Sequence, residues 1–234
     1  MNNQLIDDII INKAQEIMER QFPMVYGWQN SLLCQSSFCP VVDESIQIHF
    51  TRQNHWVCST SIGGYLRVYD SAGSKRLNAS MEAQLAEIYK FLVQGNHLEV
   101  ELPPVQIQNG ELDCGVFAIA FAYDLAAGND PTQVRYDQSK MREHLARCLS
   151  NQSFSLFPRQ QMCKNVKFRK DFAFCDIKLF CRCLMPETWD DMIECDLCDK
   201  WLHMKCENLD TLPFEQEWLC KDCRPPSPKR LRCR

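Results

Sequence analysis

The sequence predicts an α+β protein in two parts, a mixed domain over residues 1–158 and a small metal-held module over residues 178–224. Two observations support this division. Segments of helical periodicity and short segments of strand-like alternation follow one another as far as about residue 158. The 15 cysteines occur singly in that region but crowd into close pairs in the last quarter of the chain. Residues 159–177 are therefore interpreted as a linker, and residues 225–234 as a basic, proline-containing tail.

The composition is that of an ordinary globular protein, and it excludes several classes. The 26 basic and 30 acidic side chains give a formal net charge of −4, so no direct sequence-specific binding of nucleic acid is expected. No apolar run approaches the roughly 18–20 residues of a membrane span, so no membrane partner is expected. The first residues do not resemble a secretory signal, and in a reducing compartment close cysteine pairs indicate metal ligands before disulfides.

The first half of the mixed domain predicts one helix and three strands. Apolar residues recur at helical spacing over residues 5–20, and Pro23 ends that helix. Gly63-Gly64 predicts a hairpin turn between the second and third strands. Alternating apolar and polar side chains predict these strands at residues 46–50, 56–58 and 66–68.

The second half predicts a helix at the centre of the domain. Residues 114–127 are almost wholly apolar, and Gly128 stands where a helix C-cap is expected. A helix that is apolar on nearly every side is buried on nearly every side. Around it, the patterns predict helices at about residues 81–93 and 139–149, and a short strand at residues 105–107 after two prolines.

Eight metal-ligand residues in four close pairs predict two structural Zn2+ ions in the C-terminal module. The long separations between consecutive pairs favour an interleaved arrangement, in which the first and third pairs bind one ion and the second and fourth pairs bind the other. A module of about 50 residues cannot bury a sufficient core alone, so the metal supplies folding free energy. The pairs are Cys181 and Cys183, Cys195 and Cys198, His203 and Cys206, and Cys220 and Cys223.

The order of these ligands, with the histidine fifth and Trp218 two positions before Cys220, resembles the PHD finger. The resemblance covers about residues 178–224. It implies a reader of the histone H3 tail, which holds trimethyl-lysine in a cage because a quaternary ammonium is attracted to aromatic faces.

The cage positions that this resemblance implies are filled by Phe180, Met192 and Trp201, with Trp189 in the variable loop as a further wall. The alternative is that Phe180 and Trp201 simply form the small core of the zinc-held fold. Acidic side chains nearby are expected to pair with the arginine and the free amino group of the tail. These are Asp190, Asp191, Glu194 and Asp196.

A second constellation, in the mixed domain, has the residue types of thiol catalysis. Cys114 stands where a loop enters the buried apolar helix, and a helix N-terminus stabilises a thiolate. His55 is the candidate general base and acid, and Asp70 is the candidate acceptor that orients it. Gln108 is the candidate oxyanion donor, alongside the Cys114 backbone N–H. The alternative is structural, because a lone cysteine in an apolar helix is usually an inert core residue.

The chain order of these four residue types, with Asp-Cys-Gly at residues 113–115, resembles the ubiquitin-like cysteine proteases, the SUMO-specific and adenain-like family. The resemblance covers about residues 5–158 and implies a papain-like fold, with a mixed sheet and a central helix that carries the nucleophile. Trp56 is then a substrate-binding residue beside a narrow tunnel for a di-glycine tail. The second tunnel tryptophan of the family has no counterpart, since residues 4–8 contain none. Such domains often occur in transposon-derived genes.

Together these features predict a nuclear cysteine peptidase or isopeptidase, which acts on a ubiquitin-like protein or its conjugates and is targeted to methylated chromatin. The tail is interpreted as a nuclear-import signal or, with equal weight, as a solvated charged terminus. One alternative is a catalytically silent protease fold that serves as a scaffold for the histone reader. Another is acyl transfer of a different kind, as in bacterial effector acetyltransferases with the same His–acid–Cys chemistry.

Overall fold

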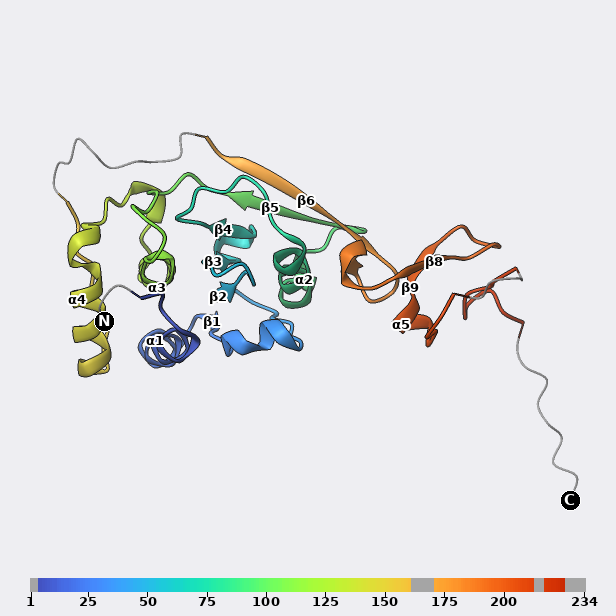
Figure 1. The fold of residues 1–234 in the computed structure, drawn as a ribbon, viewed down its shortest axis with the longest axis horizontal. Coiled ribbons are helices and arrows are strands. Elements are labelled where there is room, and N and C mark those ends of the chain that lie inside the picture. Colours follow the sequence, from blue (N-terminus) through green and yellow to red (C-terminus); the bar gives the residue numbers. More distant parts are fainter. Residues whose placement is uncertain (1–3, 161–170, 213–216, 226–234) are drawn as a thin grey trace, which may run out of the picture.

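The computed structural model describes residues 4–160, 171–212 and 217–225, and it has the predicted α+β class (Figure 1). Within these residues, no helix is both long enough and apolar enough to cross a bilayer. The helices are α1 (Asp8–Gln21), α2 (Ala79–Ile88), α3 (Cys114–Ala126), α4 (Gln138–Asn151) and α5 (Met204–Glu207). The strands are β1 (Tyr26–Gly27), β2 (Ser45–Phe50), β3 (Trp56–Thr60), β4 (Arg67–Tyr69), β5 (His97–Leu102), β6 (Ala173–Phe180), β7 (Met185–Pro186), β8 (Met192–Glu194) and β9 (Trp201–His203).

One mixed sheet of seven strands contains β1 to β7 in chain order. β2, β3 and β4 are antiparallel neighbours, whereas β1 runs parallel to β2 and β4 runs parallel to β5. The connection between β4 and β5 contains α2, as a parallel pair requires a crossover. β5, β6 and β7 are again antiparallel, and β8 and β9 form a separate two-stranded sheet.

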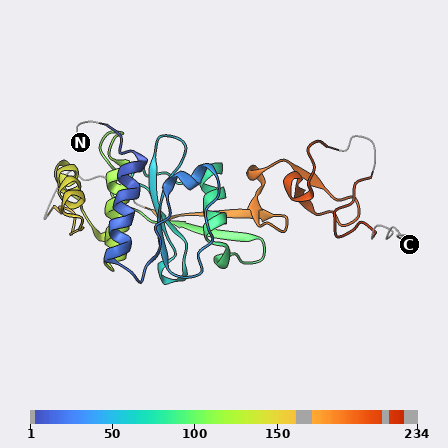
Figure 2. The ribbon, with the colours of Figure 1, turned by 90° about the horizontal axis from the view of Figure 1, so that it is seen from below.

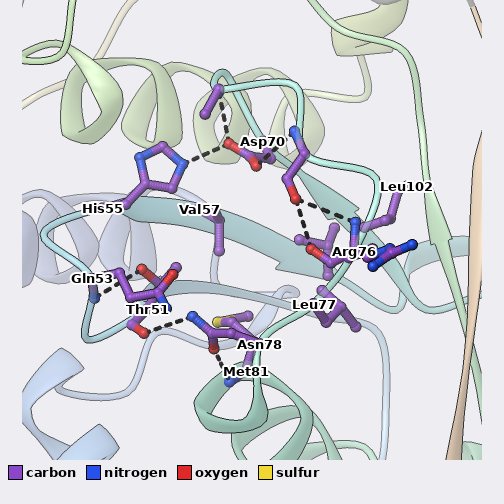
Figure 3. Close-up of a pocket in the computed structure, with 13 residues that line it drawn as sticks. Thr51, Gln53, His55, Val57, Asp70, Arg76, Leu77, Asn78, Met81 and Leu102 are labelled. Atoms are coloured by element: carbon purple, nitrogen blue, oxygen red, sulfur yellow. Dashed lines mark hydrogen bonds and ion pairs between the residues drawn. The ribbon is translucent and has the colours of Figure 1, made fainter.

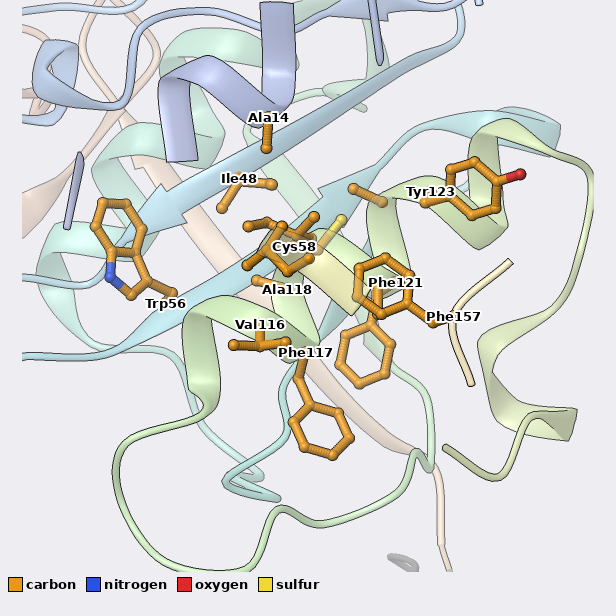
Figure 4. Close-up of a cluster of buried hydrophobic side chains, with 14 of the residues drawn as sticks. Ala14, Ile48, Trp56, Cys58, Val116, Phe117, Ala118, Phe121, Tyr123 and Phe157 are labelled. Carbon is orange, nitrogen blue, oxygen red and sulfur yellow. The ribbon is translucent and has the colours of Figure 1, made fainter. Parts of the chain in front are cut away.

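The large sheet separates two hydrophobic clusters because side chains alternate along its strands. Ile46 and Ile48 of β2 and Cys58 of β3 lie in the first cluster, whereas Val57 of β3 lies in the second. The first cluster is covered by α1, α3 and α4, and the whole of α3 from Cys114 to Asp124 is buried in it (Figure 4). The second cluster is covered by α2 (Figure 1). The prediction that α3 is the central helix is confirmed.

Side-chain caps fix where two of the helices begin. The carboxylate of Asp7 accepts the N–H of Ile10 at 2.9 Å before α1, and Asn78 accepts the N–H of Met81 at 2.9 Å before α2. α3 has no side-chain cap, because the carboxylate of its N-cap residue, Asp113, is bound by α4. The first N–H groups of α3 are therefore open to a ligand.

The strand predicted at residues 105–107 was wrong, since this segment lies outside the strands of the sheet. β5 precedes Pro103 instead, and along it Leu98, Val100 and Leu102 are buried while the residues between them are more exposed. Proline has no N–H to donate to a neighbouring strand, so the two prolines end β5 rather than introduce a strand.

The predicted linker at residues 159–177 is also corrected, because its last residues belong to β6. Residues 161–170 lie outside the described part of the chain. β6 pairs with β5 from Ala173 opposite Leu102 to Lys178 opposite His97. The charged residues of this segment resemble those of a linker. Its pairing with β5, which the sequence does not show, makes it a strand. Its alternate residues Ile177 and Leu179 are buried in the second cluster.

β6 also leads directly into the finger, which lies at one end of the elongated molecule (Figure 2). Its last two residues pair with β7, and Met185 of β7 is only 3% exposed within the second cluster. Trp189 packs against the same cluster. The two predicted parts of the chain therefore share one sheet and one hydrophobic cluster. Of the predicted tail at residues 225–234, all but Pro225 lies outside the described residues.

Candidate functional site

The turn between β2 and β3 and the end of β4 bring His55 and Asp70 together. β3 and β4 are antiparallel, so the residue before β3 and the residue after β4 lie at the same end of the sheet. His55 Nε2 donates to Asp70 Oδ1 at 2.6 Å. Asp70 also accepts the backbone N–H of Ala72 at 2.7 Å and of Ser74 at 3.2 Å, so three bonds fix its carboxylate.

Cys114 is the first residue of α3, and it lies close enough to the His55 ring to raise the pKa of that ring. Because Asp70 occupies Nε2, the ring nitrogen left for the thiol is Nδ1. Burial alone lowers the pKa of His55, but the hydrogen bonds and negative charges of Asp70 and Cys114 outweigh burial and raise this pKa to about 9. At neutral pH the ring is therefore protonated, and it lies beside the first residue of α3.

Gly115 allows the N-terminal segment to pass close over the start of α3. A Cβ added to Gly115 would lie 2.7 Å from the Cβ of Ile6, so a larger residue would displace this segment. Ile6 is itself buried, and its carbonyl accepts the indole N–H of Trp56 at 2.8 Å. The glycine that follows Cys114 is thus required by packing.

The predicted substrate-binding residue Trp56 is 5% exposed and lies in the first cluster. Its ring packs against Phe50 with 5.0 Å between ring centres. It borders a cavity of about 230 Å³ together with Leu5 and Phe50. Only a small part of the ring is therefore open to a ligand, and its role in substrate binding stays a prediction.

Gln108 borders the same cavity as His55, one of about 500 Å³ that Leu5 and Leu112 also line. The Ser71 hydroxyl donates to Gln108 Oε1 at 2.7 Å, and Gln108 Nε2 donates to the Gly110 carbonyl at 2.9 Å. An amide nitrogen carries two hydrogens, so one N–H is held within the loop and the second is left for a developing oxyanion. Ser71, which orients this amide, was not singled out from the sequence.

α4 holds the loop that precedes Cys114. Gln138 exchanges two hydrogen bonds with the backbone of Asn109, at 2.8 and 2.9 Å. Arg142 donates through Nε to Asp113 Oδ1 and through Nη2 to the Leu112 carbonyl, both at 2.6 Å. Sequence analysis missed Gln138 and Arg142, because a polar side chain on one face of a helix carries no signal of its partner in a distant loop.

The eight predicted metal ligands form two clusters, in the predicted interleaved arrangement. Within each cluster the ligand atoms lie within 4.8 Å of one another. His203 Nε2 donates to the Pro186 carbonyl at 3.1 Å, which leaves Nδ1, 3.1 Å from the Cys183 sulfur, as the ligand atom. Sets of three sulfurs and one nitrogen, or of four sulfurs, fit tetrahedral zinc. The clusters are Cys181, Cys183, His203 and Cys206, and Cys195, Cys198, Cys220 and Cys223.

Trp201 lies near two of the other predicted cage residues, Met192 on the small sheet and Phe180 at the end of β6. The register of β8 and β9 puts the side chains of Met192 and Trp201 on the same face of the small sheet. Phe180 and Trp201 both line a cavity of about 400 Å³, and Trp201 is 48% exposed. Asn96, in the loop before β5, lines this cavity too, so the large sheet contributes to its wall.

Trp189 lies elsewhere than the sequence suggested. It does not line the cavity beside Trp201; its ring packs edge-on against His203, with 5.1 Å between ring centres, and against the second cluster. The orientation of the variable loop is set by the contact between the finger and α2. The local sequence gives no sign of this contact. The role of Trp189 as a further wall of the cage stays a prediction.

Two of the four acidic side chains expected to meet a histone tail are engaged within the finger. Asp190 accepts the backbone N–H of Lys205 at 2.8 Å and pairs with its Nζ at 3.3 Å. Asp196 accepts the backbone N–H of Trp218, two residues before the final ligand pair, at 2.5 Å. Asp191 and Glu194 are exposed, so they are the acidic groups most open to a ligand.

Comparisons with known proteins cover both parts of the chain. The PHD-finger family model matches residues 180–223. Among solved structures, the chain is similar to the C-terminal Ulp1 protease domain in complex with Smt3, the yeast ortholog of SUMO, at 16% identity and a TM-score of 0.50, over 63% of this chain and 77% of that chain. It is also similar to the SUMO protease Ulp1 with its catalytic cysteine oxidised to a sulfonic acid, at 16% identity and a TM-score of 0.51, over 64% and 79% of the two chains. A search of the curated proteins found no match.

These similarities and the geometry above define the class of protein. The larger part of the chain has the fold of a Ulp1-like SUMO protease domain, and its C-terminal part is a PHD finger, a zinc-binding module. The predicted combination of the two is thereby confirmed.

Proposed function

We propose that this chain is a cysteine peptidase or isopeptidase that acts on a ubiquitin-like protein, of the SUMO kind, or on its conjugates. The observation that carries the proposal is the single imidazole shared by two partners. His55 is bonded to Asp70 at 2.6 Å and contacts the Cys114 thiol at the N-terminus of α3. An inert core cysteine needs neither a protonated imidazole nor an open helix N-terminus beside it.

In this reaction, the Cys114 thiolate attacks the carbonyl carbon of the scissile bond. Negative charge on the carbonyl oxygen is stabilised by the Cys114 backbone N–H and by Gln108 Nε2. As the C–N bond breaks, the His55 imidazolium gives its proton to the leaving nitrogen, which departs as an amine and leaves a thioester. Water then attacks the thioester and returns a proton to His55, so that the carboxylic acid leaves and the ion pair is restored. Asp70 keeps the ring oriented throughout.

Probes with an electrophilic C-terminus test this proposal. Ubiquitin, SUMO and their relatives, each carrying such a group, are incubated with the chain, and adducts are detected by intact mass. We expect one adduct on Cys114 that is lost in Cys114→Ser and retained in Cys148→Ser, a buried cysteine on α4. A wild-type chain that no probe labels would favour the silent scaffold instead.

We further infer that the finger holds two Zn2+ ions and binds the histone H3 tail at trimethyl-lysine. Two observations support this: Trp201 and Phe180 line one cavity, and Met192 shares a face of the small sheet with Trp201. Each aromatic face is worth about 0.5–2 kcal/mol toward a quaternary ammonium.

Titration of trimethylated and unmodified H3 peptides tests the reader, and metal analysis counts the zinc. We expect preference for the trimethylated peptide and about tenfold weaker binding in Trp201→Ala. Leu197→Ala, an exposed apolar residue of the same finger, is the matched control. Unchanged binding in Trp201→Ala would mean that the aromatic side chains are only packing residues. We expect two Zn2+ per chain, and fewer in Cys220→Ser.

A nuclear location is proposed from the basic tail that follows the finger. The residues Lys229, Arg230 and Arg232 lie within it. A fluorescent fusion is expected to accumulate in nuclei and to lose that accumulation when all three are changed to alanine. Equal distribution of both fusions would remove the proposal.

A further inference from the structure

A second cavity adjoins the His55–Asp70 pair, and no residue of the loop at 107–113 lines it (Figure 3). We propose that it is the subsite for the leaving portion of the substrate, and that it takes a large aliphatic side chain followed by an acidic one. The inference rests on the proposed function, since it assigns a direction to the substrate of that same site.

The cavity of about 500 Å³ that Gln108 borders is called the first cavity here. It meets the second cavity at the His55 imidazole. The second has a volume of about 430 Å³, and His55, Gln53 and Ala72 line both cavities. Beyond the imidazole, the first cavity is bounded by the loop that carries Gln108. The second is bounded by Asp70 and the loop that follows it, and by the start of α2.

The proposed reaction determines which half of the substrate lies in which cavity. The acyl half is bonded to the Cys114 sulfur during the reaction, and its oxygen lies at the donors beside Gln108. The leaving nitrogen must receive its proton from His55, so the group attached to it has to depart past the imidazole. The second cavity is lined by His55 but not by the loop at 107–113. It is therefore the cavity that the departing chain enters.

The floor of the second cavity is apolar. It is made by Val57, Val68, Met81 and Leu102, which are buried at 2–4% exposure and which the second cluster also contains. An aliphatic side chain laid over this floor would remove apolar area from water on both sides. Two polar groups at the rim are engaged with one another, since the Asn78 amide donates to the Thr51 carbonyl at 3.0 Å.

The charge around this cavity favours an anion. Of the described residues that line it, Arg76 is the only lysine or arginine, and it is exposed. Two hydrogen bonds between its backbone and the Ser74 hydroxyl, at 2.7 and 3.2 Å, fix its position. Asp70, the only carboxylate in the lining, is already bonded to His55. Figure 3 places Arg76 on the far side of the cavity from His55, so an acid would follow the aliphatic residue rather than precede it.

A binding experiment tests the subsite without catalysis. In the Cys114→Ser chain, a six-residue peptide with a free amino terminus, then leucine and glutamate, is titrated while NMR follows the methyl groups of Val57, Val68 and Leu102. We expect these methyls to shift, and the affinity to fall about fivefold when glutamine replaces glutamate or when Arg76 is changed to alanine. Lys75→Ala is the matched control, because this neighbouring lysine pairs with Asp171 at 3.9 Å and does not line the cavity.

A cleavage experiment tests the direction. Two substrates share one acyl half and differ only in the leaving half, leucine–glutamate against leucine–glutamine. We expect a kcat/KM about fivefold higher for glutamate in the wild type and a ratio near one in Arg76→Ala. Methyl shifts confined to other surfaces, or equal rates for both substrates, would overturn the subsite. Failure of every electrophilic probe to label Cys114 would overturn the proposed cleavage instead, and the two failures are distinguished because the NMR experiment requires no thiol.

Discussion

Two histidines of this chain show that the partner, not burial alone, decides the protonation of an imidazole. His49 is completely buried and bonded to the neutral amide of Gln84 at 2.9 Å, and burial lowers its pKa to about 4. His55 is partly buried, and its anionic partners raise its pKa to about 9. The first histidine is therefore structural, and the second is held ready to donate a proton.

We expect the His55 ring to lose its proton near pH 9 and to do so at lower pH in Asp70→Asn, since the amide carries no negative charge. NMR of the imidazole resonances, assigned by their absence in His55→Gln, measures this. Because the folded pKa is raised above the ordinary 6.5, the contribution of His55 to folding is fully present below pH 6.5 and is lost as the pH rises through 9. A wild-type midpoint near 6.5 would contradict the ion pair.

His49 has the opposite effect, in a different pH range. Its folded pKa of about 4 lies below the ordinary 6.5, so its contribution to stability is present above pH 6.5 and is lost as the pH falls toward 4. Between pH 7.5 and pH 5 this loss is about 2 kcal/mol. Urea unfolding at both pH values should therefore show about 2 kcal/mol less acid destabilisation in His49→Gln than in the wild type. Parallel pH profiles would contradict a neutral, buried His49.

At the scale of elements, the loop before the nucleophile depends on α4 for its conformation. Arg142 bridges a carboxylate and a carbonyl of that loop, so its removal leaves Asp113 without its ion pair. We expect Arg142→Ala to slow probe labelling of Cys114 about tenfold, because small displacements of a reacting group have large effects on rate.

The control for this prediction is Arg147→Ala, on the same helix, whose side chain is exposed and pairs with Glu143 at 3.8 Å. Arg142→Lys should restore part of the labelling rate, since lysine keeps the positive charge but cannot make both hydrogen bonds in the geometry of the guanidinium. A lower melting temperature of Arg142→Ala with an unchanged labelling rate would show that the contact serves stability alone.

Which elements could be predicted from the sequence depends on how much of their pattern is local. α1, α3 and α4 carry their own periodicity, and the strands from β2 to β4 are short alternating segments close to one another. β5 and β6 were missed because exposed charged residues, among them Glu99 and Lys178, interrupt their apolar ones. Their pairing joins segments far apart in the chain, and no local signal reports such a pairing.

The same distinction applies to the site. Zinc ligands and the His55, Asp70 and Cys114 set were predictable because each residue type implies a particular chemistry. The contacts of Gln138 and Arg142 were not, since they depend on the packing of α4 beside a loop. The packing of Trp189 against the second cluster could not be predicted for a related reason: its loop is oriented by the contact of the finger with α2.

For the whole molecule, the shared sheet predicts that the larger part of the chain is less stable when β6 and the finger are both removed. A chain that ends at residue 160 loses Ile177, Leu179 and Met185 from the second cluster. Burial of three such side chains is worth on the order of 5 kcal/mol. The shortened chain also exposes the edge of β5, and unpaired edges promote association.

Urea unfolding and size-exclusion chromatography measure both effects. A chain that ends at residue 180 is the matched comparison, because it keeps β6 and loses only Met185 of the three. We expect its stability to lie between those of the shorter and full chains. If the chain that ends at residue 160 is monomeric and as stable as the full chain, β6 does not contribute as described.

β6 ends at Phe180, and the next residue is the first metal ligand, Cys181. The same strand thus completes the protease sheet and supplies one wall of the cavity beside Trp201. The finger is consequently not an interchangeable cassette. A foreign zinc finger grafted in its place would have to bring its own edge strand for β5 and its own cover for α2, and any engineered boundary between the two parts has to cut through a strand instead of a tether.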